Sequence, residues 1–273
     1  MKRFIILVVF KDGANADVEY FYDANGALVK DLNKGISNIE YDILGNLKCI
    51  TFSNGFKTEY IYDAAGYKLR TTHESAVTNT IDYISNFVFE DGKLDKYLFD
   101  GGYCSFDNNQ NPTFLYYEKD HLGSVRMVVN EKGTIEQVNH YYPFGGVYGD
   151  LSYNAEIQKS KYIGKEFDHM HGLDLYDHGA RMYDAAKVAW DRVDRHGEKY
   201  TQLSPYLYCG NNSLVNVDAD GKRVKTIYFK DKEDPQWYRS SKSFYLAMMQ
   251  FAQTDFGKQI LSDFTPKGSY FFG

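Results

Sequence analysis

Short stretches of alternating polar and apolar residues recur along the first half of the chain, and Asp and Gly residues separate them. The stretch Glu59-Tyr60-Ile61-Tyr62, followed by Asp63 and Gly66, is one example. Alternation with a period of two predicts a strand with one buried face. Asp favours a turn because its carboxylate accepts a hydrogen bond from the backbone two residues on, and Gly adopts the positive φ that ends the turn. The pattern predicts antiparallel β-hairpins over residues 17–150.

Three of these units share the pattern Tyr-Asp-x-x-Gly. They are Tyr22, Asp23 and Gly26, then Tyr41, Asp42 and Gly45, then Tyr62, Asp63 and Gly66. A looser copy follows at residues 119–125. A single hairpin is marginally stable in water, so stacked units must share a core. We therefore expect one curled antiparallel sheet, with the tyrosine rings buried in it and the aspartates in structural turn positions.

Helical periodicity is scarce before residue 240. Two short helices are expected, over residues 155–160 and 184–188. After Gly221 the sequence turns basic, and apolar residues then recur at helical spacing. These are Phe244, Ala247, Met248, Phe251 and Ala252, then Ile260, Leu261 and Phe264. The expected fold class is mainly β, with a curled antiparallel sheet and a small α-rich C-terminal tail.

Composition and charge exclude two classes of protein. Aromatic residues make up 17% of the 273 residues, with 25 Tyr and 19 Phe, which is typical of a β protein. No apolar run approaches the roughly 20 residues that cross a bilayer, so a membrane-embedded protein is not expected. The net charge of −6 gives the body no general attraction to nucleic-acid phosphates. Residues 1–16 combine a basic start with a short apolar run, which predicts a leader strand or a weak signal-like segment.

The sequence contains no clear motif for binding a cofactor or a metal ion. The three cysteines lie far apart without zinc-ligand spacing. His169, His171 and His178 stand near acidic residues, but nothing fixes their geometry, so they are interpreted as surface histidines. The phosphate-binding and dinucleotide-binding fingerprints are absent from the sequence. We expect neither a cofactor nor a metal.

The second half of the chain resembles a known family. The matching motifs are DHLGSVR (120–126), YYPFG (141–145), YIGKE (162–166), GLDLYDHGARMYD (172–184) and SPYLYCGNNS (204–213). Their order resembles the repeat-associated core domain of bacterial Rhs proteins, and the earlier repeats resemble the Tyr-Asp (YD) repeats of that family. The resemblance implies a YD-repeat sheet over residues 17–119, a core domain over 120–222 and a variable effector-like tail over 223–273.

The resemblance to Rhs proteins implies a hollow β shell that encloses a C-terminal toxin. A few repeats cannot close such a container, because a sheet must curl through many strands before its edges meet. The chain is therefore expected to be the last portion of a longer Rhs polypeptide or a truncated copy. The implied partners are the remainder of the shell, its C-terminal cargo and an immunity protein for the tail. The implied location is outside the bacterial cell or on its surface.

The family resemblance further implies an aspartyl autoprotease that cuts the chain before the toxin. Asp194 stands at the position of the acid, and the junction falls at Gly221, Lys222 and Arg223. This chain departs from the family pattern at the junction, where Ala219 replaces Pro and Lys222 replaces an apolar residue.

An aspartyl protease needs two carboxyls that share one proton, and the sequence supplies no matched partner for Asp194. Asp191 is near in sequence, but Arg192 and Arg195 would neutralise both acids. We therefore predict a chain that stays uncut.

Three functions remain open from the sequence. The first is a non-enzymatic shell segment that encloses and presents a C-terminal effector. The second is an active toxin precursor with self-cleavage near Lys222 and an enzymatic tail. The third is a carbohydrate-binding cell-surface β protein, which would use exposed aromatic side chains.

Overall fold

The structure is a computed structural model that describes residues 13–148, 152–154 and 158–226. The leader over residues 1–12, most of the expected tail and half of the expected helix over 155–160 lie outside the described residues. The described residues up to Lys225 belong to one compact unit. Among the described residues, no helix is long and apolar enough to cross a bilayer.

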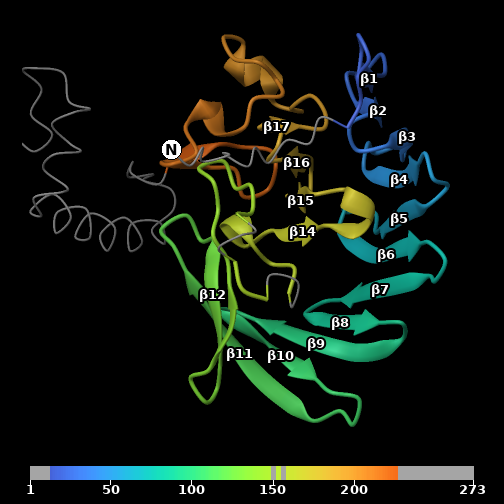
Figure 1. The fold of residues 1–273 in the computed structure, drawn as a ribbon. Helices are drawn as coiled ribbons and strands as arrows, with labels where there is room; N and C mark the ends of the chain where they lie inside the picture. The colour runs from blue at the N-terminus through green and yellow to red at the C-terminus, as the bar shows by residue number, and fades with distance from the viewer. Residues whose placement is uncertain (1–12, 149–151, 155–157, 227–273) are drawn as a thin grey trace, which may run out of the picture. The chain divides into compact units, whose positions relative to one another are not determined.

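Thirteen antiparallel strands form one sheet, in which neighbours along the chain are also neighbours in space (Figure 1). They are β1 (Tyr20–Tyr22), β2 (Leu28–Asp31), β3 (Ile36–Tyr41), β4 (Leu47–Phe52), β5 (Lys57–Tyr62), β6 (Lys68–Glu74), β7 (Asn79–Ile84), β8 (Phe87–Glu90), β9 (Lys93–Phe99), β10 (Gly102–Phe106), β11 (Pro112–Lys119), β12 (Val125–Asn130) and β13 (Ile135–Val138). This chain of hairpins confirms the mainly β fold class.

The turns lie where the Tyr-Asp repeats predict them. The Oδ1 atom of Asp63 accepts hydrogen bonds from the amides of Ala65 and Tyr67, both at 2.8 Å. Asp23 and Asp42 make the same pair of bonds in their own turns. The glycines that end the three turns have positive φ, namely Gly26 (+75°), Gly45 (+77°) and Gly66 (+85°). The local pattern therefore fixes each hairpin.

The repeat tyrosines are buried less uniformly than the sequence predicts. Tyr41 and Tyr62 are half-buried and pack against the main core. Tyr22 is 47% exposed, so the prediction of a buried ring is wrong there. The reason is position, because β1 is the first strand of the sheet and has β2 as its neighbour on one side. The ring of Tyr22 instead meets the ring of Tyr206 edge-on at 5.6 Å.

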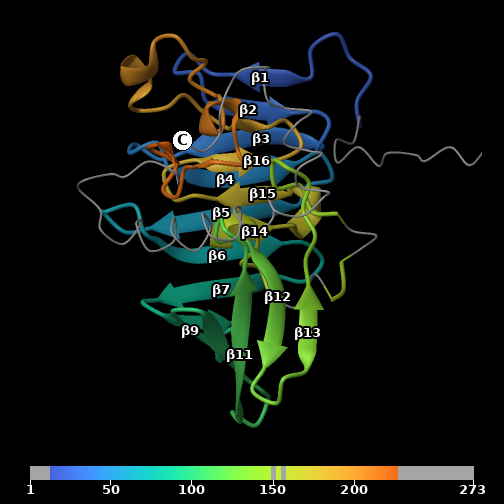
Figure 2. The same ribbon diagram turned by 90° about the vertical axis from the view of Figure 1, so that its left-hand side faces the viewer.

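A smaller four-stranded sheet lies along the inner face of β2–β6 (Figures 1 and 2). Its strands are β14 (Glu166–Asp168), β15 (Leu175–Asp177), β16 (Met182–Asp184) and β17 (Ala189–Trp190). The other short elements are the 3₁₀ turns η2 (Tyr162–Gly164), η3 (Met170–Gly172), η4 (Gly197–Tyr200) and η5 (Cys209–Asn211), and the strands β18 (Asn216–Val217) and β19 (Lys225–Thr226).

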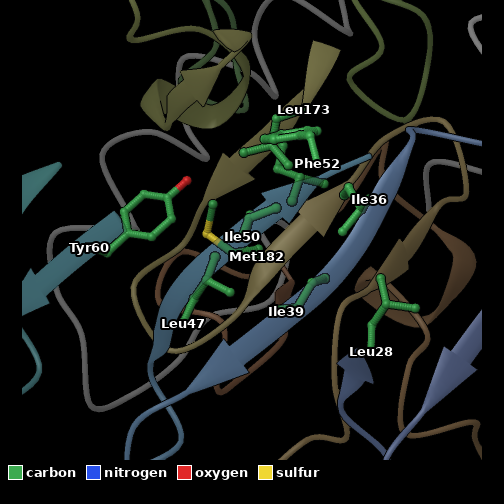
Figure 3. Packing of buried hydrophobic residues seen from close by; sticks show 10 residues of the cluster. Leu28, Ile36, Ile39, Leu47, Ile50, Phe52, Tyr60, Leu173 and Met182 are labelled. Atoms are coloured by element: carbon green, nitrogen blue, oxygen red, sulfur yellow. The ribbon is translucent and has the colours of Figure 1, made fainter. Parts of the chain in front are cut away.

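Apolar side chains from both sheets form the main core. Met182 packs beside Ile50, and Leu173 beside Phe52 (Figure 3). A second cluster is aromatic and belongs to the second half of the chain. Its members are Tyr162, Tyr176, Tyr183, Trp190, Tyr208 and Cys209. The rings of Tyr183 and Tyr208 stack with centroids 3.7 Å apart.

Partly buried lysines join the two sheets by ion pairs. The ammonium of Lys68 in β6 lies 2.9 Å from Glu166 Oε2 and 2.8 Å from Asp177 Oδ2. Lys34 lies 3.0 Å from Asp184 Oδ2. The small sheet is thus bound to the large one by charge as well as by apolar packing.

The helix expected over residues 184–188 is a turn between β16 and β17. Oδ1 of Asp184 accepts hydrogen bonds from the amides of Ala186 at 2.9 Å and Lys187 at 3.3 Å, and Val188 has a φ of +55°. An Asp carboxylate can cap a helix or close a turn. Here the positive φ ends the segment before a helix can form.

Candidate functional site at the junction

The side chain of Arg181 joins the candidate acid to the candidate junction. This residue precedes β16 and is 3% exposed. Its Nη2 lies 2.9 Å from Asp194 Oδ2 and 3.3 Å from Asp218 Oδ2. Its Nε donates a hydrogen bond to the carbonyl oxygen of Gly221 at 2.7 Å. The guanidinium lies over the ring of Trp190, 4.2 Å from its centroid. One buried cation therefore contacts two carboxylates and the main chain of the junction.

The main chain of the junction is held against the core. The amides of Lys222 and Arg223 donate to Asp218 Oδ1 at 3.1 and 3.2 Å. Gly221 has a φ of +69°, and a Cβ there would lie 3.0 Å from the backbone nitrogen of Arg181. A larger residue would be strained and crowded at this position. The side chains of Lys222 and Arg223 are exposed, so the backbone makes the attachment.

The structure brings Asp194 and Asp218 to the same nitrogen of Arg181, an arrangement that the sequence does not reveal. Asp191, the neighbour considered from sequence, accepts a hydrogen bond from the amide of Met182 at 3.0 Å and lies 3.4 Å from Arg192. The expectation that Arg192 and Arg195 neutralise Asp194 also differs from the structure. Arg195 donates to the carbonyl oxygen of Leu44.

Residues far apart in sequence build the Arg181 site, which explains why pattern reasoning missed it. Asp218 lies 37 residues after Arg181, and Asp194 lies 13 after it. Asp218 belongs to the junction motif itself, so its nearness to Gly221 was visible in the sequence. Its approach to Asp194 depends on how the core folds.

Burial and the charge of Arg181 act in opposite directions on the pKa of the Asp218 carboxyl. Burial raises the pKa of Asp218, and the charge of Arg181 opposes that rise. A guanidinium that donates to two carboxylates stabilises their ionised forms. Aspartyl hydrolysis instead needs one carboxyl to keep its proton beside the other. The arrangement thus combines an ion-paired clamp with two acids close to a peptide segment.

His178 is the second side chain that contacts the junction segment. Its Nδ1 lies 2.6 Å from the carbonyl oxygen of Asp218, and its ring meets Trp190 edge-on at 5.0 Å. It is 2% exposed, so the interpretation as a surface histidine is wrong for this residue, whereas His169 is exposed. Burial lowers the pKa of His178 to about 3, which keeps the imidazole neutral. Within the described ranges, no group of three or more His, Cys, Asp or Glu is placed to hold a metal ion.

Known proteins share this fold and sequence pattern. The family model described as Teneurin YD-shell matches residues 13–212. The chain is 29% identical over 235 residues to Salivary gland surface protein 1 of Aedes aegypti, covering 76% of this chain and 7% of the relative. It is 25% identical over 234 residues to Toxin subunit YenC1 of Yersinia entomophaga, covering 82% of this chain and 22% of the relative.

The crystal structure of TcdB2-TccC3 superimposes on this fold with a TM-score of 0.62 and 22% identity, covering 73% of this chain and 11% of that chain. Both curated relatives are much longer than the segment they share with this chain. The Tyr-Asp hairpins and the family match over well more than half of the residues agree with the resemblance to Rhs proteins. The chain belongs to the Teneurin YD-shell family.

Proposed function

We propose that this chain is a non-enzymatic segment of an Rhs-type toxin shell, which encloses and presents a C-terminal effector. Membership of the YD-shell family and the similarity to Toxin subunit YenC1 support a shell role. The likeness to TcdB2-TccC3 adds a solved structure with the same fold. The partners of the chain would be further shell strands and the cargo that follows residue 222, with an immunity protein for that cargo.

The main structural support for the proposal is the attachment of residues 218–223 to the core. Arg181 holds the carbonyl of Gly221, and Asp218 holds the amides of Lys222 and Arg223. A shell that presents a cargo must fix the point at which the cargo leaves its wall. The hydrogen-bonded main chain supplies that fixed point without engaging the exposed side chains of Lys222 and Arg223.

Hydrogen exchange of the full chain tests this attachment. We expect the amides of Lys222 and Arg223 to exchange slowly in the native protein. In Arg181→Gln they should exchange at least about tenfold faster, because the carbonyl of Gly221 loses its donor. Arg192→Gln is the matched control, since Arg192 pairs with Asp191 away from the junction. Fast exchange of both amides in the native chain, with the large sheet still protected, would contradict the proposal.

A toxin precursor with aspartyl self-cleavage is the second candidate, and the meeting of Asp194 and Asp218 beside Gly221 favours it. Self-cleavage would add water across the peptide bond after Lys222. It would give two pieces, and either Asp194→Asn or Asp218→Asn would leave one chain, because an amide cannot act as a general acid or base. We favour the uncut chain because the guanidinium of Arg181 lies 2.9 Å from Asp194 Oδ2 and 3.3 Å from Asp218 Oδ2, where aspartyl hydrolysis needs the two carboxyls to share a proton.

The remaining parts of the proposal concern the rest of the molecule. We propose a division into a YD-repeat sheet over 17–119, a core over 120–222 and an effector tail from 223. Export or attachment to the cell surface is supported by similarity to a salivary surface protein and a toxin subunit. Secretion assays in the source organism, with the full gene, would test the location.

A further inference from the structure

A pocket lies between the large sheet and the small one. One wall is the turn between β5 and β6, over residues 62–68, and the other is residues 165–179 around β14 and β15. His178, which contacts the junction segment, also lines this pocket. The pocket is open to solvent and has a volume of about 240 Å³. Pockets for drug-sized ligands measure about 300 to 1,000 Å³, so this one has room for a smaller molecule.

Two lysines line this pocket, and their partners differ. Lys68 is held by two ion pairs, at 2.9 Å from Glu166 Oε2 and 2.8 Å from Asp177 Oδ2. Lys165 is partly buried, yet within the part of the chain that the structure describes its ammonium has no hydrogen-bond or ion-pair partner. Burial without a partner disfavours the charged form of a lysine. The amine of Lys165 is therefore the group in the pocket that is free to bind a ligand.

The surroundings of Lys165 favour an uncharged amine. Burial lowers the pKa of Lys165 from its ordinary value. Carboxylates near it oppose that fall in pKa without reversing it, namely those of Asp177, Asp220 and Asp218. A lysine with a lowered pKa keeps more of its amine unprotonated near neutral pH, and the unprotonated amine is a nucleophile. Lys165 thus combines a nucleophilic amine with a pocket that can hold its reaction partner.

The other groups that line the pocket favour an uncharged, aromatic ligand. With a neutral Lys165 amine, Lys68 and its two carboxylate partners leave one more negative charge than positive, which disfavours an anion. The hydroxyl of Tyr62 keeps its proton because burial raises its pKa, and burial keeps the imidazole of His178 neutral, at a pKa of about 3. The ring of Tyr67 lines the pocket, is 73% exposed and offers a face on which an aromatic ring can pack.

We propose that Lys165 captures small uncharged aromatic aldehydes as imines in this pocket. The lone pair of Nζ forms a bond to the carbonyl carbon of the aldehyde. The carbonyl oxygen then leaves with both amine hydrogens as one molecule of water, so that a C=N bond replaces the C=O bond. The step needs no oxidant or reductant, and water reverses it. The aromatic ring of the aldehyde packs on the ring of Tyr67.

Reductive trapping on the full chain tests the proposal, with benzaldehyde as the probe. Cyanoborohydride reduces each imine to a stable benzyl amine, and peptide mass spectrometry then gives a rate for every lysine. At pH 7 we expect Lys165 to react at least about tenfold faster than Lys48, because one unit of pKa changes the unprotonated fraction about tenfold. Lys48 is the matched control, since its side chain is 61% exposed and lies 3.8 Å from Glu40, outside the pocket.

Two further readouts separate a binding pocket from an amine that is merely reactive. The rate at Lys165 should saturate with benzaldehyde concentration and level off between about pH 7 and pH 10, whereas the rate at Lys48 should keep rising in both series. Tyr67→Ala should raise the half-saturating concentration at least about threefold and leave the pH profile of Lys165 unchanged. Lys165→Arg should abolish the fast reaction, because a guanidinium keeps its proton.

Three results would each overturn the proposal of an aldehyde site at Lys165. The first is an equal rate of trapping at Lys165 and Lys48 at pH 7. The second is a rate at Lys165 that rises in proportion to benzaldehyde at every concentration. The third is a half-saturating concentration that Tyr67→Ala leaves unchanged, in a variant that is as stable to urea as the native chain.

Discussion

At the scale of single residues, the tyrosine of the Tyr-Asp repeat contributes differently to stability in different strands. Tyr41 is half-buried, donates a hydrogen bond to the carbonyl oxygen of Leu28 at 2.8 Å and lies under the guanidinium of Arg192. Tyr22 is 47% exposed. We expect Tyr41→Ala to lower the free energy of unfolding by about 3 kcal/mol and Tyr22→Ala by about 1 kcal/mol. Urea denaturation measures both, and equal losses would show that strand position does not matter.

The Lys68 cluster predicts a dependence of stability on pH. The charge of Lys68 holds the pKa values of Asp177 and Glu166 below their usual values, against the effect of burial. Groups with a lowered folded pKa stabilise the protein above their unfolded pKa and lose that contribution as the pH falls. Lys68→Met should therefore lower the free energy of unfolding by about 3 kcal/mol near neutral pH. Below about pH 4 the free energies of unfolding of the variant and the native protein should approach each other.

The control for Lys68 is an exposed pair in the same sheet. Lys48 lies 3.8 Å from Glu40, and both side chains are more than half exposed. Lys48→Met should change the free energy of unfolding by less than about 1 kcal/mol at every pH, because solvent screens such pairs. Urea unfolding measures the free energy of unfolding of Lys68→Met and of the native protein from pH 7 to pH 3. A difference between the two that stays constant over this range would show that the ion pairs of Lys68 do not account for its contribution to stability.

At the scale of elements, the turns share one backbone conformation but not one sequence. Gly66 has a φ of +85°, and a Cβ there would lie 3.7 Å from Asn46 Oδ1. Gln110 holds the equivalent place in the turn that Asp107 caps, with a φ of +61°. Gly66→Ala should cost about 1 kcal/mol, and Gln110→Gly should stabilise by about 0.5 kcal/mol. Thermal unfolding measures the stability of both variants. A stabilised Gly66→Ala together with a destabilised Gln110→Gly would refute this account of the turns.

Hairpins could be predicted because each turn depends on contacts within five residues. Two turns were missed for equally local reasons. The Asp107 turn has Gln110 where the pattern expects Gly, and the turn at residues 130–134 uses the side chain of Asn130 in place of Asp. The Arg181 site could not be predicted, because its contacts join segments that come together through the aromatic cluster and the small sheet.

At the scale of the whole molecule, the large sheet is open within the described residues. Its order runs from β1 to β13, and these two strands are not paired with each other there. An unpaired edge accepts further strands. The open edge explains why the first repeat has the most exposed tyrosine of the three, and under the proposed function it is where further shell strands would pair.

The central claim is that the chain holds its C-terminal tail as one covalent piece, fixed at the Arg181 site. Intact-mass spectrometry of the freshly purified full chain tests it most directly. We predict one species with the mass of all 273 residues, unchanged in Asp194→Asn except for the substitution itself. Two species that divide at or within two residues of Arg223, and that merge into one in Asp194→Asn, would contradict the claim and establish self-cleavage.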